Sequence, residues 1–139
     1  MSDTYGARIR IEGQEEVIRN LNKLIEASEE AAKTTVAKTS LEVKKLAQQK
    51  VKFQTGRLRT SVAIAMKGKT EMTGVASFGG ERVTNLSVPN SPFMAIVGTD
   101  VDYARAQEFG KHGRAYLIPA LNESMDFMER SIKNEFKKL

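Results

Sequence analysis

Apolar residues recur at steps of three and four through the C-terminal part of the chain. They are Ile118, Leu121, Met125, Met128, Ile132, Phe136 and Leu139. This spacing places them on one face of an α-helix, which has about 3.6 residues per turn. Pro119 stands where the first turn of a helix tolerates proline, and Lys137 and Lys138 stand where the helix dipole favours cations. The pattern predicts an amphipathic C-terminal helix.

The N-terminal part of the chain also has a helical period. Residues 7–12 alternate apolar and charged side chains, which predicts a half-buried strand that Gly13 ends. Apolar residues then recur at helical spacing: Val17, Leu21, Leu24, Ile25, Ala32, Val36, Val43, Ala47 and Val51. We expect one long helix, or two with a bend near Ser28, ending before Gly56, since glycine is suited to closing a helix.

The middle of the chain changes to a period of two, which is typical of strands. Residues 62–67 alternate in this way, and Gly68 with Lys69 offers a tight two-residue turn. Residues 70–78 then predict the partner strand of a hairpin. Residues 93–97 form a short apolar run that predicts a buried strand.

A short helix over residues 103–109 is expected next, capped by Asp102 and stopped by Gly110. Residues 79–92 form a long connection that is either a loop or a hairpin arm, since apolar residues alternate within it. The expected order is β-α-β-β-β-α. This is an α+β fold in which a mainly antiparallel sheet of about four strands is packed by a long N-terminal helix and a C-terminal helix. We expect a single domain over residues 1–139.

The residue types present exclude several kinds of site. Cysteine is absent and His112 is the single histidine. Disulfides, thiolate metal sites, a cysteine nucleophile and a multi-histidine metal site within one subunit are therefore excluded. No apolar run of about 18 residues predicts a membrane span, and the N-terminal residues lack the pattern of a signal peptide. We expect a cytosolic origin and no membrane partner.

Positive charge is concentrated in one segment of the chain. Residues 33–69 carry ten basic side chains and a single acidic one, Glu42, whereas the flanking segments are slightly acidic. The candidate basic surface consists of Lys38, Lys45, Lys52, Arg57 and Arg59. Such a surface is typical either of a solvated helix face or of a small protein that binds a nucleic-acid backbone. Aromatic residues are not interleaved with these side chains, so stacking on bases is not indicated.

Catalytic patterns are weak in this sequence. Asp100, Asp102 and Glu108 would bind a divalent cation only if they converged, and a strand end followed by a helix cap explains the two aspartates. His112 lacks an accompanying nucleophile motif. A small hydrolase using Asp100, Asp102 and His112 is the least favoured hypothesis. We expect no catalytic residue, no metal, no cofactor and no small-molecule substrate.

Three short segments carry a resemblance when they are read in order. The first contains Thr55, Gly56 and Leu58; the second contains Tyr103, Ala104, Glu108, Phe109 and Gly110; the third contains Arg114, Tyr116, Pro119 and Ala120. Their order and spacing resemble the tail-completion proteins (head–tail joining, or neck, proteins) of long-tailed bacteriophages and prophages. The resemblance spans nearly the whole chain. The sequence departs from the family pattern at Ala115, where proline is usual, at Lys111, and in lacking a proline just before Thr55.

The resemblance implies a structural virion protein without catalytic activity, made in the cytoplasm of the bacterial host. Such proteins assemble as a ring, commonly six-fold, at the head-proximal end of the tail and help to join the tail to the head. The implied partners are further copies of the chain, the tail-tube protein and the head-connector proteins. The basic segment would face either a neighbouring subunit or DNA passing through the ring. A ring requires heterologous contacts, in which one patch meets a different patch on the next copy.

Most of the motif residues have a structural interpretation. A helix stop explains Gly56, a helix start explains Pro119 and Ala120, and core positions are expected for Leu58, Tyr103 and Phe109. Glu108 is the exception, because the fold does not obviously require a carboxylate there. We hypothesise that it pairs with Arg57 or Arg114. Leu41 lies among lysines, where it could mark a subunit contact.

Overall fold

In the computed structural model, the chain is built along one long helix, α1 (Gln14–Lys50). The structure describes residues 14–51, 56–101, 104–110 and 115–139. At about 1.5 Å per residue, α1 extends roughly 55 Å. It runs without interruption past Ser28, whose hydroxyl donates a hydrogen bond to the Leu24 carbonyl 2.8 Å away. The prediction of one long helix ending before Gly56 is therefore confirmed, and the alternative with a bend is not.

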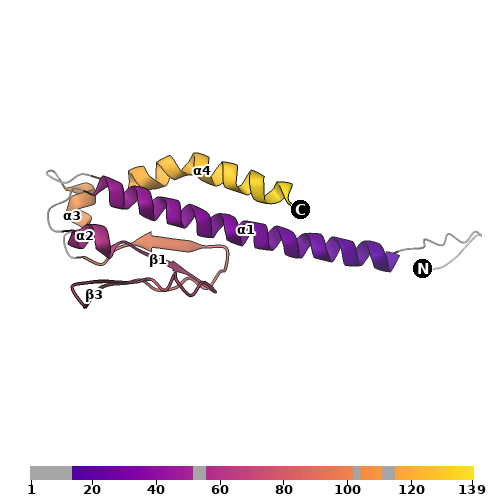
Figure 1. Ribbon diagram of the computed structural model, residues 1–139, viewed down its shortest axis with the longest axis horizontal. Helices are drawn as coiled ribbons and strands as arrows, with labels where there is room; N and C mark the ends of the chain where they lie inside the picture. Colours follow the sequence, from indigo (N-terminus) through magenta and orange to yellow (C-terminus); the bar gives the residue numbers. More distant parts are fainter. Residues whose placement is uncertain (1–13, 52–55, 102–103, 111–114) are drawn as a thin grey trace, which may run out of the picture.

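Helix α4 (Leu117–Lys137) and the strands lie on either side of α1 (Figure 1). Ion pairs join Lys50 to Glu123 and Lys38 to Glu135, so α4 runs antiparallel to α1. Figure 1 also shows that α1 continues well beyond the C-terminal end of α4 and beyond the strands. The N-terminal half of α1 therefore projects from the rest of the fold.

Four strands form two small antiparallel sheets. Strand β1 (Ala63–Met66) pairs with β4 (Ala95–Gly98), and β2 (Val75–Phe78) pairs with β3 (Glu81–Asn85). All four residues of β1 are buried, and Ile64 and Met66 pack against α1 at Val36 and Ala37. The α+β class with a long N-terminal helix, a C-terminal helix and four antiparallel strands is as expected. The strands form two sheets, whereas the sequence analysis predicted one.

The predicted hairpin between residues 62–67 and 70–78 forms only in part. Backbone hydrogen bonds join Met66 to Met72 (2.9 Å) and Gly74 to Ile64 (2.8 Å). At Gly74 the backbone adopts a φ of 83°, and a Cβ atom there would lie 2.5 Å from the Leu86 carbonyl oxygen. Beyond this point the chain leaves β1 and becomes β2, which pairs with β3. The turn at Gly74 is thus why the sheet divides.

Residues 79–92 were expected to form either a loop or a hairpin arm. The structure has a hairpin, because residues 81–85 are strand β3 and close onto β2 through Gly79 and Gly80. Both glycines have positive φ values, 61° and 80°, which residues with a side chain rarely adopt.

A buried cluster packs the C-terminal end of α1 against residues from the middle and from the C-terminal part of the chain. It contains Val43, Ala47, Val51, Leu58, Val83, Val101, Ala104, Tyr116 and Ala120. Two short helices, α2 (Arg57–Ser61) and α3 (Ala104–Phe109), contribute to it. The sequence analysis missed α2, since five residues are too few to show a helical period.

Other predictions need correction or lie outside the described residues. The observed order is α1-α2-β1-β2-β3-β4-α3-α4. The strand expected at residues 7–12 and the cap expected at Asp102 fall on residues that the structure does not describe. Gly56 has the left-handed conformation expected of it (φ 76°), but it precedes α2 and does not cap α1, which ends at Lys50. The core position expected for Phe109 is wrong, because its side chain is 70% exposed.

Candidate functional site

The apolar stripe of α4 is not the face that packs on α1. Ala120 and Ser124, four residues apart, are fully buried, and Ala120 belongs to the cluster around α1. The Ser124 hydroxyl is satisfied within the helix, since it donates to the Ala120 carbonyl at 2.7 Å. By contrast, Ile118, Leu121, Met125, Met128 and Phe136 are between one third and one half exposed. Small residues let the two helices approach, and the large apolar side chains of α4 are left at the surface.

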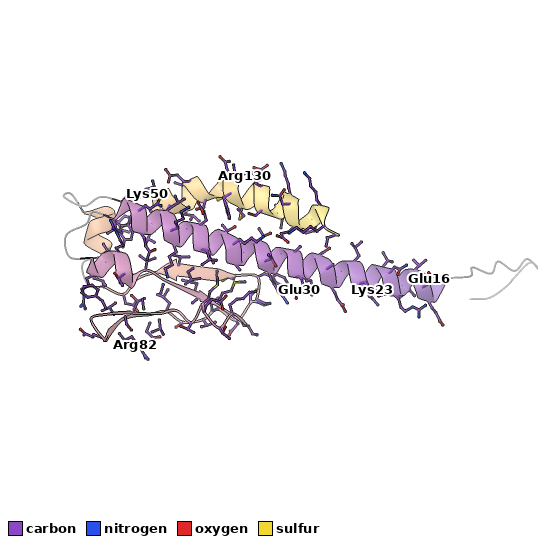
Figure 2. All side chains as sticks on the ribbon, viewed as in Figure 1. Glu16, Lys23, Glu30, Lys50, Arg82 and Arg130 are labelled. Carbon is purple, nitrogen blue, oxygen red and sulfur yellow. The ribbon has the colours of Figure 1, made fainter. Side chains whose placement is uncertain are left out.

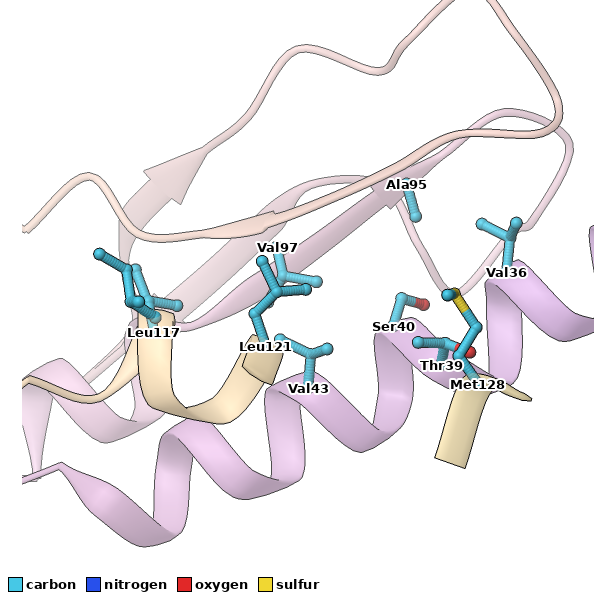
Figure 3. Close-up of a pocket in the computed structure, with 10 residues that line it drawn as sticks. Val36, Thr39, Ser40, Val43, Ala95, Val97, Leu117, Leu121 and Met128 are labelled. Atoms are coloured by element: carbon cyan, nitrogen blue, oxygen red, sulfur yellow. The ribbon is translucent and has the colours of Figure 1, made fainter. Parts of the chain in front are cut away.

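Three of these side chains, those of Ile118, Leu121 and Met128, line an apolar groove (Figure 3). Its floor is α1 and its walls are α4 and β4, and its volume is about 330 Å³. The lining residues are Val36, Thr39, Ser40, Val43, Ala95, Val97, Leu117, Ile118, Leu121 and Met128. Contiguous exposed apolar surface of this kind marks interaction sites in folded proteins.

A second apolar surface lies on the projecting half of α1. Every residue from Glu15 to Glu26 is exposed, including Val17, Ile18, Leu21, Leu24 and Ile25, each of which is about half exposed. These five side chains continue the stripe that is covered by α4 and the strands farther along the same helix. Figure 2 shows this half of α1, marked by Glu16 and Lys23, standing clear of the other described elements. We call these five residues the projecting stripe.

The side chains of the candidate basic surface differ in exposure, and some of them are paired with carboxylates. Lys38 forms an ion pair with Glu135 at 2.6 Å, and the hydrogen bond from its ammonium holds the pKa of that carboxyl below its ordinary value. Lys45 is exposed. Lys52 lies outside the described residues.

The two arginines of the candidate basic surface belong to α2 and so lie apart from the lysines on α1. The Arg57 guanidinium lies 3.9 Å from the Glu81 carboxylate. Arg59 is half-buried, and its carbonyl accepts a hydrogen bond from Gln48.

The motif residues gather at one end of the molecule. Leu58, Ala104, Tyr116 and Ala120 all belong to the buried cluster at the end of α1. Phe109 and Gly110 are exposed beside it. Thr55, Tyr103 and Arg114 lie outside the described residues. The structure thus brings four of the nine described motif residues together in the buried cluster.

Glu108 has a role that the sequence analysis missed. Its carboxylate accepts hydrogen bonds from the backbone N–H groups of Tyr116 (2.9 Å), Leu117 (2.7 Å) and Ile118 (3.3 Å). It therefore caps the N-terminus of α4, where anionic groups are favoured. The premise that the fold requires no carboxylate at Glu108 is wrong, and the pairing of Glu108 with Arg57 or Arg114 stays a prediction. No local spacing signals this cap, because the carboxylate comes from a different helix.

Of the three residues considered for a hydrolase, only Asp100 lies in the part of the chain that the structure describes. Asp100 accepts a hydrogen bond from the Asn85 backbone N–H at 2.7 Å, whereas Asp102 and His112 lie outside the described ranges. Among the described residues, no three histidine, aspartate or glutamate side chains converge where they could hold a metal ion. Within the same residues, no helix has the length and apolar character needed to span a membrane.

Fold and surface together define the class of protein: a small α+β domain whose prominent features are a projecting apolar helix and an apolar groove. The profile of the family described as "Bacteriophage HK97-gp10, putative tail-component" matches residues 15–110, which is more than half of the chain. The chain belongs to this family of phage tail components, which implies a place in the virion. The match begins with α1 and ends just after α3. No curated protein and no solved structure gives a significant match.

Proposed function

We propose that the protein is a structural component that assembles as a ring at the head-proximal end of the phage tail and helps to join the tail to the head. Its family supports a role in the tail. The observation that carries the ring is that one chain exposes two different apolar surfaces, the projecting stripe and the groove. Different patches on one chain allow head-to-tail contacts, which close into rings when the rotation between copies permits.

The protein would act by binding other virion proteins and would catalyse no reaction. A ring of six subunits would contact the tail-tube protein on one side and head-connector proteins on the other. The protein would act through these contacts alone, with no reaction and no small-molecule substrate. The same geometry leaves the exposed Lys45 and its neighbours available to line a passage for DNA.

A deletion experiment tests this function. Phage lacking the gene should accumulate DNA-filled heads and finished tails that remain separate, as counted by electron microscopy of lysates. Supplying the intact chain from a plasmid should restore joined, infectious particles. Joined and infectious particles in the absence of the protein would refute the proposal.

The concentration of charge in residues 33–69 favours a second candidate, a small nucleic-acid-binding protein. That function predicts duplex binding whose affinity falls steeply between two salt concentrations, because phosphate contacts release counterions. The assembly function predicts little duplex binding at physiological salt. The ion pair between Lys38 and Glu135 favours the assembly function, since it neutralises one of the lysines within the fold.

A further inference from the structure

We propose that the projecting stripe of one copy docks into the apolar groove of the next copy, so that α1 of each subunit lies between α4 and β4 of its neighbour. The inference deepens the proposed function, on which it rests for the existence of subunit contacts, by assigning the two surfaces that meet. The occupant of the groove is thus a second copy of this chain.

The projecting stripe is an apolar surface that is left exposed to solvent. Within the fold, the same helical face of α1 is covered by α4 and the strands at Val43 and Ala47, which are 6% and 0% exposed. At Leu21 the face is 53% exposed. The part of α1 marked by Glu16 and Lys23 stands clear of the other described elements (Figure 2). Because most of the stability of a helix in a protein comes from packing of its apolar face, a partner that buries the stripe would stabilise this half of α1.

The projecting stripe cannot enter the groove of the same subunit. Val36 and Val43 of α1 line the groove, and Leu21 stands on the same unbroken helix. Leu21 precedes Thr39, another lining residue, by 18 positions, which separates the two by roughly 27 Å along the axis. A rigid helix does not fold back on itself, so the contact must be made between copies.

The projecting stripe and the α4 wall of the groove match in length and in apolar character. The stripe from Val17 to Ile25 extends roughly 12 Å, and the α4 wall from Ile118 to Met128 extends roughly 15 Å. The stripe is built from valine, isoleucine and leucine side chains, and the wall from leucine, isoleucine and methionine side chains. An amphipathic helix lying in an apolar groove is a recurring mode of recognition, in which side chains at helical spacing serve as anchors.

The two halves of α1 carry opposite net charges. Residues 14–30 of α1 carry five glutamates and two basic side chains, a net charge of −3. Residues 31–50, which include the groove-floor residues Val36, Thr39, Ser40 and Val43, carry five lysines and one glutamate, a net charge of +4. Two of these lysines, Lys38 and Lys50, are paired with Glu135 and Glu123 of α4, and the segment keeps an excess of positive charge beyond these pairs. Placing the first segment of one copy beside the second segment of the next brings opposite charges together. Two projecting halves packed on each other would bring like charges together.

The test uses variants that each damage one surface. Leu21→Asp places a carboxylate in the stripe, and Leu121→Asp places one in the groove wall. Each variant alone should lose association by about tenfold or more, because the carboxylate would be buried without a partner. Asn20→Asp is the matched control: it makes the same change of charge next to Leu21 but off the stripe, and it should associate like the unmodified chain.

Mixing the two damaged variants gives the sharpest result. The Leu121→Asp chain keeps an intact stripe and the Leu21→Asp chain keeps an intact groove, so the mixture should form a single heterodimer and nothing larger in native mass spectrometry. Two monomers, at a concentration where the unmodified chain associates, would overturn the inference. Dimers of Leu121→Asp alone would also overturn it, since they would show that the projecting stripes pair with each other.

A second measurement is made in assembled particles. The chain has no cysteine, so a Leu21→Cys and Leu121→Cys double variant carries only these two thiols. Treatment of variant virions with a short bis-maleimide should give covalent multimers on denaturing gels, and either single cysteine variant should not. Virions that contain the double variant only as monomers after treatment would overturn the inference and leave the proposed function intact. Particles that join heads and tails without any of this protein would refute the proposed function itself.

Discussion

Glu108 and Pro119 together account for every backbone N–H group at the start of α4. The Glu108 carboxylate accepts hydrogen bonds from residues 116, 117 and 118, and Pro119 has no N–H group to satisfy. The next N–H, that of Ala120, donates to the Tyr116 carbonyl at 3.2 Å and begins the regular helical pattern. Because the first turn of a helix has no internal partners for these groups, the two residues complete one cap between them.

Replacing the Glu108 carboxylate should therefore destabilise the fold. Glu108→Ala leaves three N–H groups of α4 without their acceptor, and we expect a loss of roughly 1–3 kcal/mol in the free energy of unfolding. Glu108→Gln keeps one oxygen but loses the charge that the helix N-terminus favours, so its loss should be smaller. Urea unfolding followed by circular dichroism measures both values. An alanine variant as stable as the unmodified chain would contradict this assignment.

Much of the architecture could be predicted from the sequence because it follows from periodicity. The helical repeats at residues 17–51 and 118–139 located α1 and α4, and alternation at residues 62–67 located β1. Periodicity identifies the residues that share a face, however, and says nothing of which neighbour covers it. The α4 stripe around Leu121 was found correctly, but the side that packs on α1 is the one with Ala120 and Ser124.

The rest could not be predicted because it depends on contacts between distant segments. The cap from Glu108 to α4 and the close approach of Gly74 to Leu86 join residues that no local pattern connects. The exposure of Phe109 follows from the same cap, since Glu108 takes the inward position at the end of α3. The pair of small residues four positions apart on α4, Ala120 and Ser124, was the available signal for close helix packing.

Gly74 should not tolerate a side chain. A Cβ atom at this position would lie 2.5 Å from the Leu86 carbonyl oxygen, and the φ of 83° is unfavourable for any other residue type. We expect Gly74→Ala to lower the free energy of unfolding by about 2 kcal/mol or more. Gly68→Ala is the matched control, because its φ is 80° but nothing lies within 4 Å of the added atom. Its cost should be about 1 kcal/mol. Equal losses in the two variants would show that close approach at Gly74 is unimportant.

The ion pair between Lys38 and Glu135 should make stability depend on pH. The pKa of Glu135 is lowered in the fold, chiefly by the hydrogen bond from Lys38, so the folded chain binds this proton less readily than the unfolded chain does. The stabilisation is complete above the ordinary glutamate pKa of about 4.3 and is lost as the pH falls through the lowered value.

Lys38→Met should therefore be less stable than the unmodified chain at neutral pH, with the difference shrinking in acid. Urea midpoints measured at several pH values between neutral and about 3 test this expectation. Lys133→Met removes the same charge from α4, where Lys133 forms an ion pair with Glu129 of its own helix at 3.1 Å. The Lys133 variant should show no such convergence with the unmodified chain. A Lys38→Met difference that persisted unchanged in acid would rule out the pair as its source.

The same substitution at two leucines should separate folding from docking. Leu58 is 4% exposed in the buried cluster, and Leu58→Ala should cost roughly 2–5 kcal/mol, since it removes core contacts and leaves a cavity. Leu121 is 51% exposed beside the groove, and Leu121→Ala should cost about 1 kcal/mol or less. Denaturant unfolding of dilute protein measures both, because dilution removes any contribution of association. If Leu121→Ala cost as much as Leu58→Ala, the α4 stripe would belong to the core of the subunit and would not be a surface that it offers to other chains.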